Sequence, residues 1–189
     1  MNAVFLAACS PRRGGNSDFA ASLVRLTIGA PCETRRVAEE GVRPCVSCGF
    51  CDGRPGECSL DGPGDGARVL FERMCRSPLS VVVSPVYFYH LPAQAKAWID
   101  RTQRFWACGK KPGEGRPVTA VLLGARPRGE KLFEGAERTL RYMALTLGLT
   151  WVEPLRLYGL DAPGDLAASP EAADRVRDFA SELSRRFLA

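Results

Sequence analysis

Long apolar runs and dense clusters of one charge are both missing from this 189-residue sequence. No segment reaches the roughly 18 uninterrupted apolar residues that a membrane-spanning helix needs, so we expect no membrane insertion. The net charge of +5 is modest, and without a Lys/Arg run we expect no nucleic-acid partner. The chain shows no basic leader, and its first apolar run is too short for a signal peptide, so we expect a cytoplasmic protein.

Histidine and the common nucleotide motifs are also scarce. His90 is the only histidine, and a lone histidine is more often a hydrogen-bonding residue at a helix start than a catalyst. The sequence shows neither a His-based triad nor a clear carboxylate pair. No G-x-G-x-x-G follows the first strand, and Gly124 and Gly129 have P-loop spacing but precede Glu130 rather than lysine. These absences exclude a dinucleotide held in the Rossmann manner and ATP in a P-loop.

Short apolar runs alternate with longer helical patterns along the chain, which is typical of βαβ units and a parallel sheet. The sequence predicts strands at 3–8, 33–37, 79–84, 118–123 and 150–157 and helices at 16–29, 67–76, 92–105, 131–147 and from 170 onward. In the first helix, Phe19, Leu23 and Leu26 form the expected buried stripe. We predict one doubly wound α/β domain over residues 1–189, with a cysteine-rich loop insertion at about 38–66.

The turn after the first strand has the composition of an anion site. Residues 9–17 combine hydroxyls, an amide, glycines and guanidinium groups just ahead of a helix. Ligands of open α/β sheets bind at the carboxyl ends of strands. Helix N-termini favour anions there, and arginine adds charge-assisted bonds to phosphate. We therefore interpret this turn as a phosphate site, with a plain capping turn as the alternative.

Aromatic residues follow the third strand, in residues 84–92. Beside a phosphate loop they suit a planar ring that needs apolar contact and backbone hydrogen bonds, although a simple core cluster would give the same pattern. The loop after the fourth strand, residues 124–129, is placed to close over the polar edge of such a ring.

Four of the eight cysteines are spaced as Cys45-x2-Cys48-x2-Cys51-x6-Cys58. Three thiolates at this spacing plus a fourth are typical of iron–sulfur ligation. A structural zinc site and reduced thiols without metal are the alternatives. A disulfide framework is not expected in a reducing cytosol. The remaining cysteines are expected to be small buried or incidental residues, namely Cys9, Cys32, Cys75 and Cys108.

The motifs Ser10-Pro11-Arg12-x2-Gly15-Asn16-Ser17, Ser84-Pro85-Val86-Tyr87-Phe88 and Lys96-x2-Ile99-Asp100-Arg101 occur in this order. Together with the cysteine loop they resemble the NADPH-dependent FMN reductase superfamily, and the compact cysteine motif resembles its iron–sulfur flavoproteins. The resemblance implies a flavodoxin-like three-layer sandwich with a five-stranded parallel sheet of order 2-1-3-4-5. It also implies bound FMN and a homo-oligomer, either a dimer or a tetramer.

The resemblance assigns roles to residues of this chain. It places Ser10, Arg12, Asn16 and Ser17 at the FMN phosphate, and Pro85, Val86, Tyr87 and Phe88 along the isoalloxazine, with Gly124 at the far rim. It assigns Cys45, Cys48, Cys51 and Cys58 to a [4Fe-4S] cluster close to a flavin, across a subunit boundary. Two positions depart from the family pattern, which has Gly where Cys9 stands and an Asp-Asp pair where this chain reads Asp61-Gly62.

A flavin takes up a hydride or passes single electrons itself, so no side-chain nucleophile is required. Our first hypothesis is an oxidoreductase of the iron–sulfur flavoprotein type that transfers electrons between a [4Fe-4S] cluster and FMN. The second is an NAD(P)H-dependent FMN or quinone reductase without a cluster, in which the cysteines only shape the loop. The third is a non-catalytic flavin electron carrier. A redox partner protein such as a ferredoxin is expected.

Overall fold

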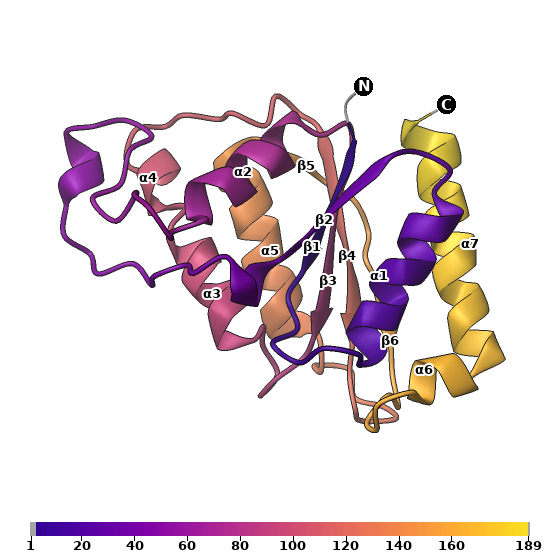
Figure 1. Ribbon diagram of the computed structural model, residues 1–189. Helices are drawn as coiled ribbons and strands as arrows, with labels where there is room; N and C mark the ends of the chain where they lie inside the picture. Colours follow the sequence, from indigo (N-terminus) through magenta and orange to yellow (C-terminus); the bar gives the residue numbers. More distant parts are fainter. Residues whose placement is uncertain (1–2, 189) are drawn as a thin grey trace.

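The computed structural model describes residues 3–188 and consists of a central sheet with helices on both faces (Figure 1). The helices are α1 (Asn16–Thr27), α2 (Ala67–Arg76), α3 (Ala93–Asp100), α4 (Gln103–Trp106), α5 (Glu134–Leu147), α6 (Asp165–Ala168) and α7 (Pro170–Phe187). Helices α2, α3 and α5 cover one face of the sheet, and α1 and α7 cover the other. The predicted three-layer α/β architecture is confirmed.

The sheet is parallel, and its order β2-β1-β3-β4-β5 confirms the predicted order 2-1-3-4-5. Its strands are β1 (Val4–Ala8), β2 (Cys32–Arg36), β3 (Ser80–Pro85), β4 (Pro117–Leu123), β5 (Thr150–Trp151) and β6 (Leu155–Leu157). Both β5 and β6 pair with β4. The prediction of one continuous strand over 150–157 is therefore wrong. Pro154 lies in the break, and proline cannot donate a ladder hydrogen bond.

Alternate side chains of β1 enter two separate cores, because successive residues of a strand point to opposite faces. Phe5 and Ala7 pack toward α2, α3 and α5, whereas Val4 and Leu6 pack toward α1 and α7. In α1 the buried stripe contains Ala20, Leu23 and Val24, with Phe19 packed at its edge. The expectation for Leu26 is wrong, since its side chain is 72% exposed on the outer side of the helix.

Two helices depart from their predicted ranges by more than two residues. The predicted helix over 92–105 is interrupted after Asp100, and α4 starts again at Gln103. Thr102 donates its hydroxyl proton to the carbonyl of Ile99, and Arg101 is directed into a buried ion-pair network. Helix α5 begins at Glu134 rather than at residue 131. None of the helices within residues 3–188 combines the length and apolarity needed to cross a bilayer.

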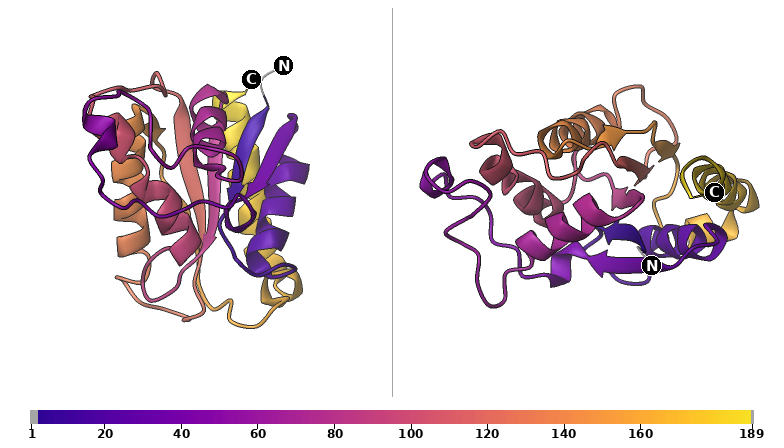
Figure 2. Two further views of the ribbon diagram at one scale, coloured as in Figure 1. Left: turned by 60° about the vertical axis from the view of Figure 1, so that its left-hand side comes forward. Right: turned by 90° about the horizontal axis from the view of Figure 1, so that it is seen from above.

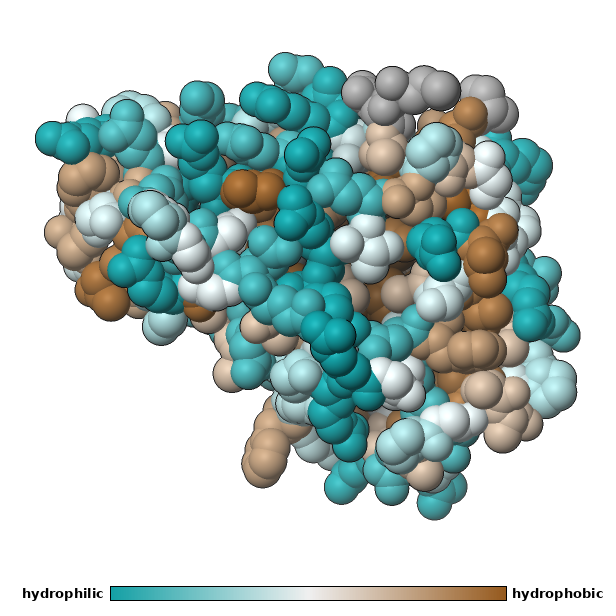
Figure 3. All heavy atoms as spheres, viewed as in Figure 1, coloured by the Kyte–Doolittle hydropathy of each residue, from teal (hydrophilic) through white to brown (hydrophobic). Residues whose placement is uncertain are grey.

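The cysteine-rich segment, residues 38–66, runs out past α3 and α4 to one end of the molecule (Figure 2). Its 3-10 turn at Phe50–Asp52 contacts α4, and the one at Val37–Glu39 contacts α3. In the space-filling view, apolar side chains gather among polar ones at this end (Figure 3). The segment therefore forms a long loop on one side of the sheet, and the chain rejoins the layers of the fold at α2.

Candidate cofactor sites

A cleft of about 510 Å³ lies at the carboxyl ends of β1 and β3. Its lining contains the residues predicted for FMN except Gly124, namely Ser10, Arg12, Asn16, Ser17, Pro85, Val86, Tyr87 and Phe88. Gly124 lies behind the wall formed by its neighbours, where a Cβ atom would meet a Leu132 methyl group at 2.6 Å. Three further lining residues come from the loop after β6, which the sequence analysis did not assign to the site, namely Leu160, Asp161 and Pro163.

The turn between β1 and α1 is closed by its own side chains. Ser10 Oγ accepts a hydrogen bond from the Arg12 N–H at 3.2 Å and donates one to the Arg12 carbonyl at 3.0 Å. Helix α1 then begins after Gly15 without a side-chain cap. Uncapped first-turn N–H groups and the positive end of the helix dipole favour an anion at this end of the cleft.

The side chain of Asn16 is engaged elsewhere. Its Nδ2 donates to the Ala162 carbonyl at 2.9 Å, and its Oδ1 accepts from the N–H groups of Gly164 and Leu166 at 3.2 and 3.0 Å. These bonds tie the start of α1 to the loop that enters α6. Asn16 therefore shapes the cleft by holding its far wall, whereas the resemblance placed this residue at the phosphate.

Arg36, at the end of β2, supports the turn from behind and was missed in the sequence analysis. Its Nη2 donates to the carbonyls of Arg12 at 2.9 Å and Ser10 at 3.4 Å, and its Nη1 bonds to Asp18. Asp18 in turn accepts from the Gly14 N–H at 2.6 Å. The position of Arg36 at the end of its strand could have indicated this role. In the parallel sheet it pairs in register with Ala8, the last residue of β1 before the turn.

The aromatic loop contains a two-residue turn with unusual backbone angles. Tyr87 and His90 exchange both backbone hydrogen bonds, at 2.8 and 2.9 Å, around Phe88 (φ 50°) and Tyr89 (φ 62°). Turns with two positive φ values usually contain Asn-Gly or Asp-Gly. Left-handed conformation costs a side-chain-bearing residue roughly 1–2 kcal/mol, so the turn is strained.

His90 anchors this turn as a neutral imidazole. Its Nδ1 accepts from the Leu91 N–H at 2.9 Å, so the proton lies on Nε2, which is 3.0 Å from the hydroxyl of Thr139 in α5. Burial, followed by the charge of Lys96, lowers the pKa of His90. The histidine therefore has a structural position at a helix start, in agreement with the sequence interpretation.

The four clustered cysteines, Cys45, Cys48, Cys51 and Cys58, line one cavity of about 160 Å³ together with two arginines, Arg101 and Arg104. Cys48 Sγ lies 3.1 Å from Ser59 Oγ, and the hydrogen bond with Ser59 lowers the pKa of Cys48. Within residues 3–188, however, no three His, Cys, Asp or Glu side chains are grouped closely enough to hold a metal ion. The fold thus gathers the thiols at one cavity without arranging them as a ligand set.

A buried ion-pair network fastens this segment to the helices. Arg101, whose side chain is 0% exposed, donates to Asp61 at 2.9 Å, to Asp65 at 2.7 Å and to the Arg43 carbonyl at 3.0 Å. Arg104 makes two 2.7 Å bonds to Asp61. Asp61, the retained first residue of the family's Asp-Asp pair, is therefore a shared acceptor for both guanidinium groups.

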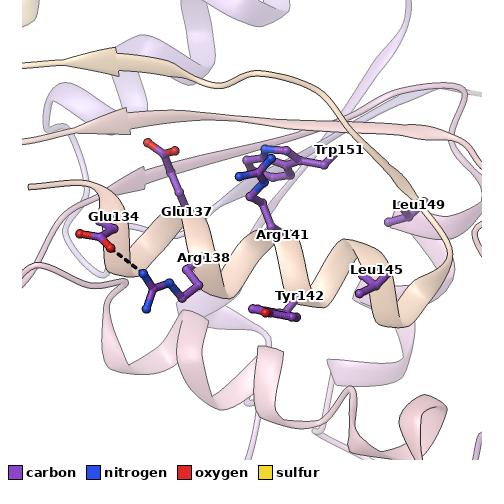
Figure 4. Close-up of a pocket in the computed structure, with 8 residues that line it drawn as sticks. All are labelled: Glu134, Glu137, Arg138, Arg141, Tyr142, Leu145, Leu149 and Trp151. Carbon is purple, nitrogen blue, oxygen red and sulfur yellow. Dashed lines mark hydrogen bonds and ion pairs between the residues drawn. The ribbon is translucent and has the colours of Figure 1, made fainter. Parts of the chain in front are cut away.

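Other cysteines and one other cavity do not form sites of this kind. Cys9 and Cys75 are buried, as expected, and burial raises the pKa of each thiol to about 12. A further cavity, of about 670 Å³, lies along α5 and β5 (Figure 4) and contains none of the predicted residues. Glu134 and Glu137 on its wall already pair with Arg138 and Arg156.

Comparisons with known proteins bear on the family and the fold of the chain. A family model described as NADPH-dependent FMN reductase matches residues 1–149. The iron–sulfur flavoprotein of Methanosarcina thermophila is 34% identical over 96 residues, which cover 49% of this chain and 48% of the relative. That of Archaeoglobus fulgidus is 33% identical over 95 residues, which cover 49% and 41%. The match therefore spans about half the length of these curated relatives, or less.

The fold recurs among solved structures. The NAD(P)H:quinone oxidoreductase from Methanothermobacter marburgensis superposes with a TM-score of 0.68 at 18% identity, with 96% of each chain covered. At this identity the likeness demonstrates a shared flavodoxin-like fold.

Replacing Arg36 by Met should loosen the turn after β1, because the carbonyls of Ser10 and Arg12 lose their common donor. We expect FMN to bind about tenfold more weakly, in line with the loss of a charge-assisted hydrogen-bond network. Fluorescence titration of FMN measures this. Arg25→Ala, an exposed residue near the end of α1, removes the same charge and should leave the affinity unchanged. Equal affinities in both variants would contradict a supporting role for Arg36.

Asp65→Asn should destabilise the protein by about 3 kcal/mol at pH 7, because it leaves the buried Arg101 charge undercompensated. Burial raises the pKa of Asp65, but hydrogen bonds from Arg101, Arg43 and Ala67 outweigh it and hold the pKa below 3.8. The stabilisation is therefore present above pH 3.8 and is lost as the pH falls through the lower folded-state pKa.

Urea unfolding at a series of pH values measures this difference. The gap between wild type and Asp65→Asn should persist down to about pH 4 and shrink below it. Asp52→Asn, which alters an exposed carboxylate of the same segment, is the matched control. A gap that stays constant to pH 2 would show that the Asp65 charge is not responsible.

Proposed function

The chain belongs to the NADPH-dependent FMN reductase family, and on that premise we propose that it is an oxidoreductase that holds FMN in the cleft at the carboxyl ends of β1 and β3. The observation that carries the proposal is the union in one cleft of an anion-favouring turn and an apolar, aromatic wall. When bound, FMN supplies the hydride and electron chemistry itself.

Residues of this chain account for both ends of such a ligand. At the turn, Arg12 and the uncapped start of α1 face a phosphate, and Arg36 keeps the turn in shape through the Ser10 and Arg12 carbonyls. Along the wall, Pro85 and Val86 provide apolar surface for a planar ring. The Val86 N–H is already bonded to the Leu123 carbonyl at 2.8 Å, which fixes this wall against β4.

We further propose that Cys45, Cys48, Cys51 and Cys58 hold a [4Fe-4S] cluster and that electrons pass between the cluster and FMN. The donor set is appropriate, because all four thiols border one cavity and both curated relatives are called iron–sulfur flavoproteins. The buried guanidinium groups of Arg101 and Arg104 line the same cavity, and each has an Nε–H without a protein acceptor. Each of these N–H groups is a donor that suits a thiolate or cluster sulfur.

The thiols have to move closer together to ligate a cluster. Ser47 and Gly49 occupy left-handed backbone conformations on either side of Cys48. Metal binding generally orders a site that is not preformed. The ion pairs of Asp61 and Asp65 fix the far end of the segment, so the adjustment is confined to residues 45–58.

A second candidate is an NAD(P)H-dependent FMN or quinone reductase without a cluster. The separation of the thiols and the fold shared with a quinone oxidoreductase favour it. A non-catalytic flavin carrier remains the third. For all three we propose a cytoplasmic homo-oligomer, a dimer or tetramer, in line with the resemblance to the family. A redox partner such as a ferredoxin is proposed for the cluster-bearing form and the carrier.

Anaerobic purification with flavin and iron quantitation separates these candidates. The cluster-bearing form should contain one FMN and about four irons per chain. Cys48→Ala should remove the iron and its broad absorbance while FMN stays bound, because the cysteine cavity and the cleft are separate. Cys108→Ala, a cysteine outside the segment, is the matched control and should retain both cofactors.

Iron-free yellow protein that NADPH bleaches would instead support the second candidate, and yellow protein reduced only by another protein would support the third. Loss of both cofactors in Cys48→Ala would contradict separate sites.

A further inference from the structure

Two buried arginines border the cysteine cavity, and each has one N–H donor that the protein leaves without an acceptor. We propose that the Nε–H groups of Arg101 and Arg104 donate hydrogen bonds to sulfur atoms of the cluster and thereby raise its reduction potential. This inference rests on the proposed function, in which the four clustered cysteines hold that cluster. It adds the residues of this chain that set the potential at which the cluster exchanges electrons.

The terminal nitrogens of both guanidinium groups face acceptors of the protein. Arg104 directs Nη1 and Nη2 at the two carboxylate oxygens of Asp61, each at 2.7 Å. Arg101 directs Nη1 at Asp65 and at the Arg43 carbonyl, and its Nη2 reaches the shared Asp61. Because the guanidinium group is planar and rigid, Nε–H points along a different edge from the terminal pair. In both residues this remaining donor has no partner.

Neither Nε–H group can turn to water instead. The side chains of Arg101 and Arg104 are 0% and 1% exposed, and the Arg104 guanidinium lies over the Phe71 ring at 6.0 Å. A buried donor without a partner costs roughly 1–3 kcal/mol, and more when it belongs to a charged group. Such groups are rare in folded proteins. Two of them on the residues that line one cavity indicate that the cavity holds a ligand with acceptor atoms.

Sulfur is the acceptor that lies in the buried part of this cavity. The other polar side chains on its lining are exposed to solvent, namely Ser47, Asp52, Ser59 and Gln103. Three of the four thiols are half-buried, namely Cys45, Cys51 and Cys58. Hydrogen bonds to the sulfur atoms of an iron–sulfur cluster are one of the means by which a protein sets its reduction potential.

The direction of the effect follows from charge. Each transfer adds one electron to the cluster, makes it one unit more negative, and neither forms nor breaks a bond. Positively charged donors stabilise this more negative, reduced form more than the oxidised form, and a cavity shielded from water strengthens the effect. The two arginines therefore raise the potential. Asp61 carries the opposite charge, so its loss should have the opposite effect.

A redox titration followed by EPR measures the potential of anaerobically purified protein that contains iron and FMN. Arg104→Gln removes the Nε–H and its charge, so the ratio of oxidised to reduced cluster at a fixed potential should rise about tenfold, which is about 59 mV for one electron. Arg54→Gln is the matched control, because it removes the same charge from an exposed side chain of the cysteine segment, stacked at 4.6 Å on the Phe50 ring. Solvent and salt screen that charge, so the ratio should stay unchanged.

Asp61→Asn separates this role from a merely structural one. It weakens the same ion pairs but keeps both Nε–H groups and removes a negative charge, so the ratio should fall. If the arginines only held the segment in place, the loss of Arg104 and the loss of Asp61 would shift the ratio in the same direction, and that result would overturn the inference. A wild-type ratio in Arg104→Gln, or an equal shift in Arg54→Gln, would also overturn it.

A measurement on the unmutated protein covers the case in which a variant fails to assemble its cluster. In protein labelled with ¹⁵N-arginine, pulsed EPR of the reduced cluster should show a ¹⁵N coupling, because a hydrogen-bonded Nε lies in contact with a cluster sulfur. Iron-loaded protein without that coupling would contradict the inference. Wild-type protein that contains FMN but no iron would instead contradict the proposed cluster, while the flavin site would stand.

Discussion

The parallel register of β1 between β2 and β3 is the constraint on which the candidate site depends. Ala8 is aligned with Arg36 on one side and with Val83 on the other, so three chain segments leave the sheet at the same edge. This alignment brings the Arg36 side chain under the turn that follows β1 and sets the aromatic loop opposite it. A one-residue slip of β2 would turn Arg36 to the other face and leave the carbonyls of the turn without their donor.

Both candidate sites use the same device, a largely buried guanidinium group from a distant element that holds a loop by its carbonyls and carboxylates. Arg36 binds two carbonyls and Asp18 at the cleft, and Arg101 binds one carbonyl and two aspartates behind the cysteine cavity. Arginine suits this role because its planar group offers several donors in fixed directions and stays charged when buried. The loops are thereby ordered without a large apolar core of their own.

Alternating patterns and short motifs are local signals, and they sufficed to predict a parallel α/β sheet and the location of the cleft, whereas the strand order followed from the resemblance to a known family. The family match ends at residue 149. Beyond it, the last helix was predicted from its Ser169-Pro170 start and its apolar stripe, and the structure contains both. Features that depend on distant partners were missed. The break after α3 follows from contacts of Arg101 with residues 36 to 58 positions away, and the Asn16 amide bonds to residues about 150 positions away. The positive φ angles of Phe88 and Tyr89 could not be predicted from the sequence, because neither residue is a glycine or asparagine.

The central claim is that the turn after β1 is an anion site for the phosphate of a flavin, and a comparison of FMN with riboflavin tests it most directly. The two ligands share the isoalloxazine and the ribityl chain, and riboflavin lacks only the phosphate. Equilibrium dissociation constants measured by fluorescence quenching should show FMN binding at least about a hundredfold more tightly, the effect of two or so charge-assisted hydrogen bonds. Equal affinity for both flavins would contradict the account, since the turn would then contribute nothing to recognition.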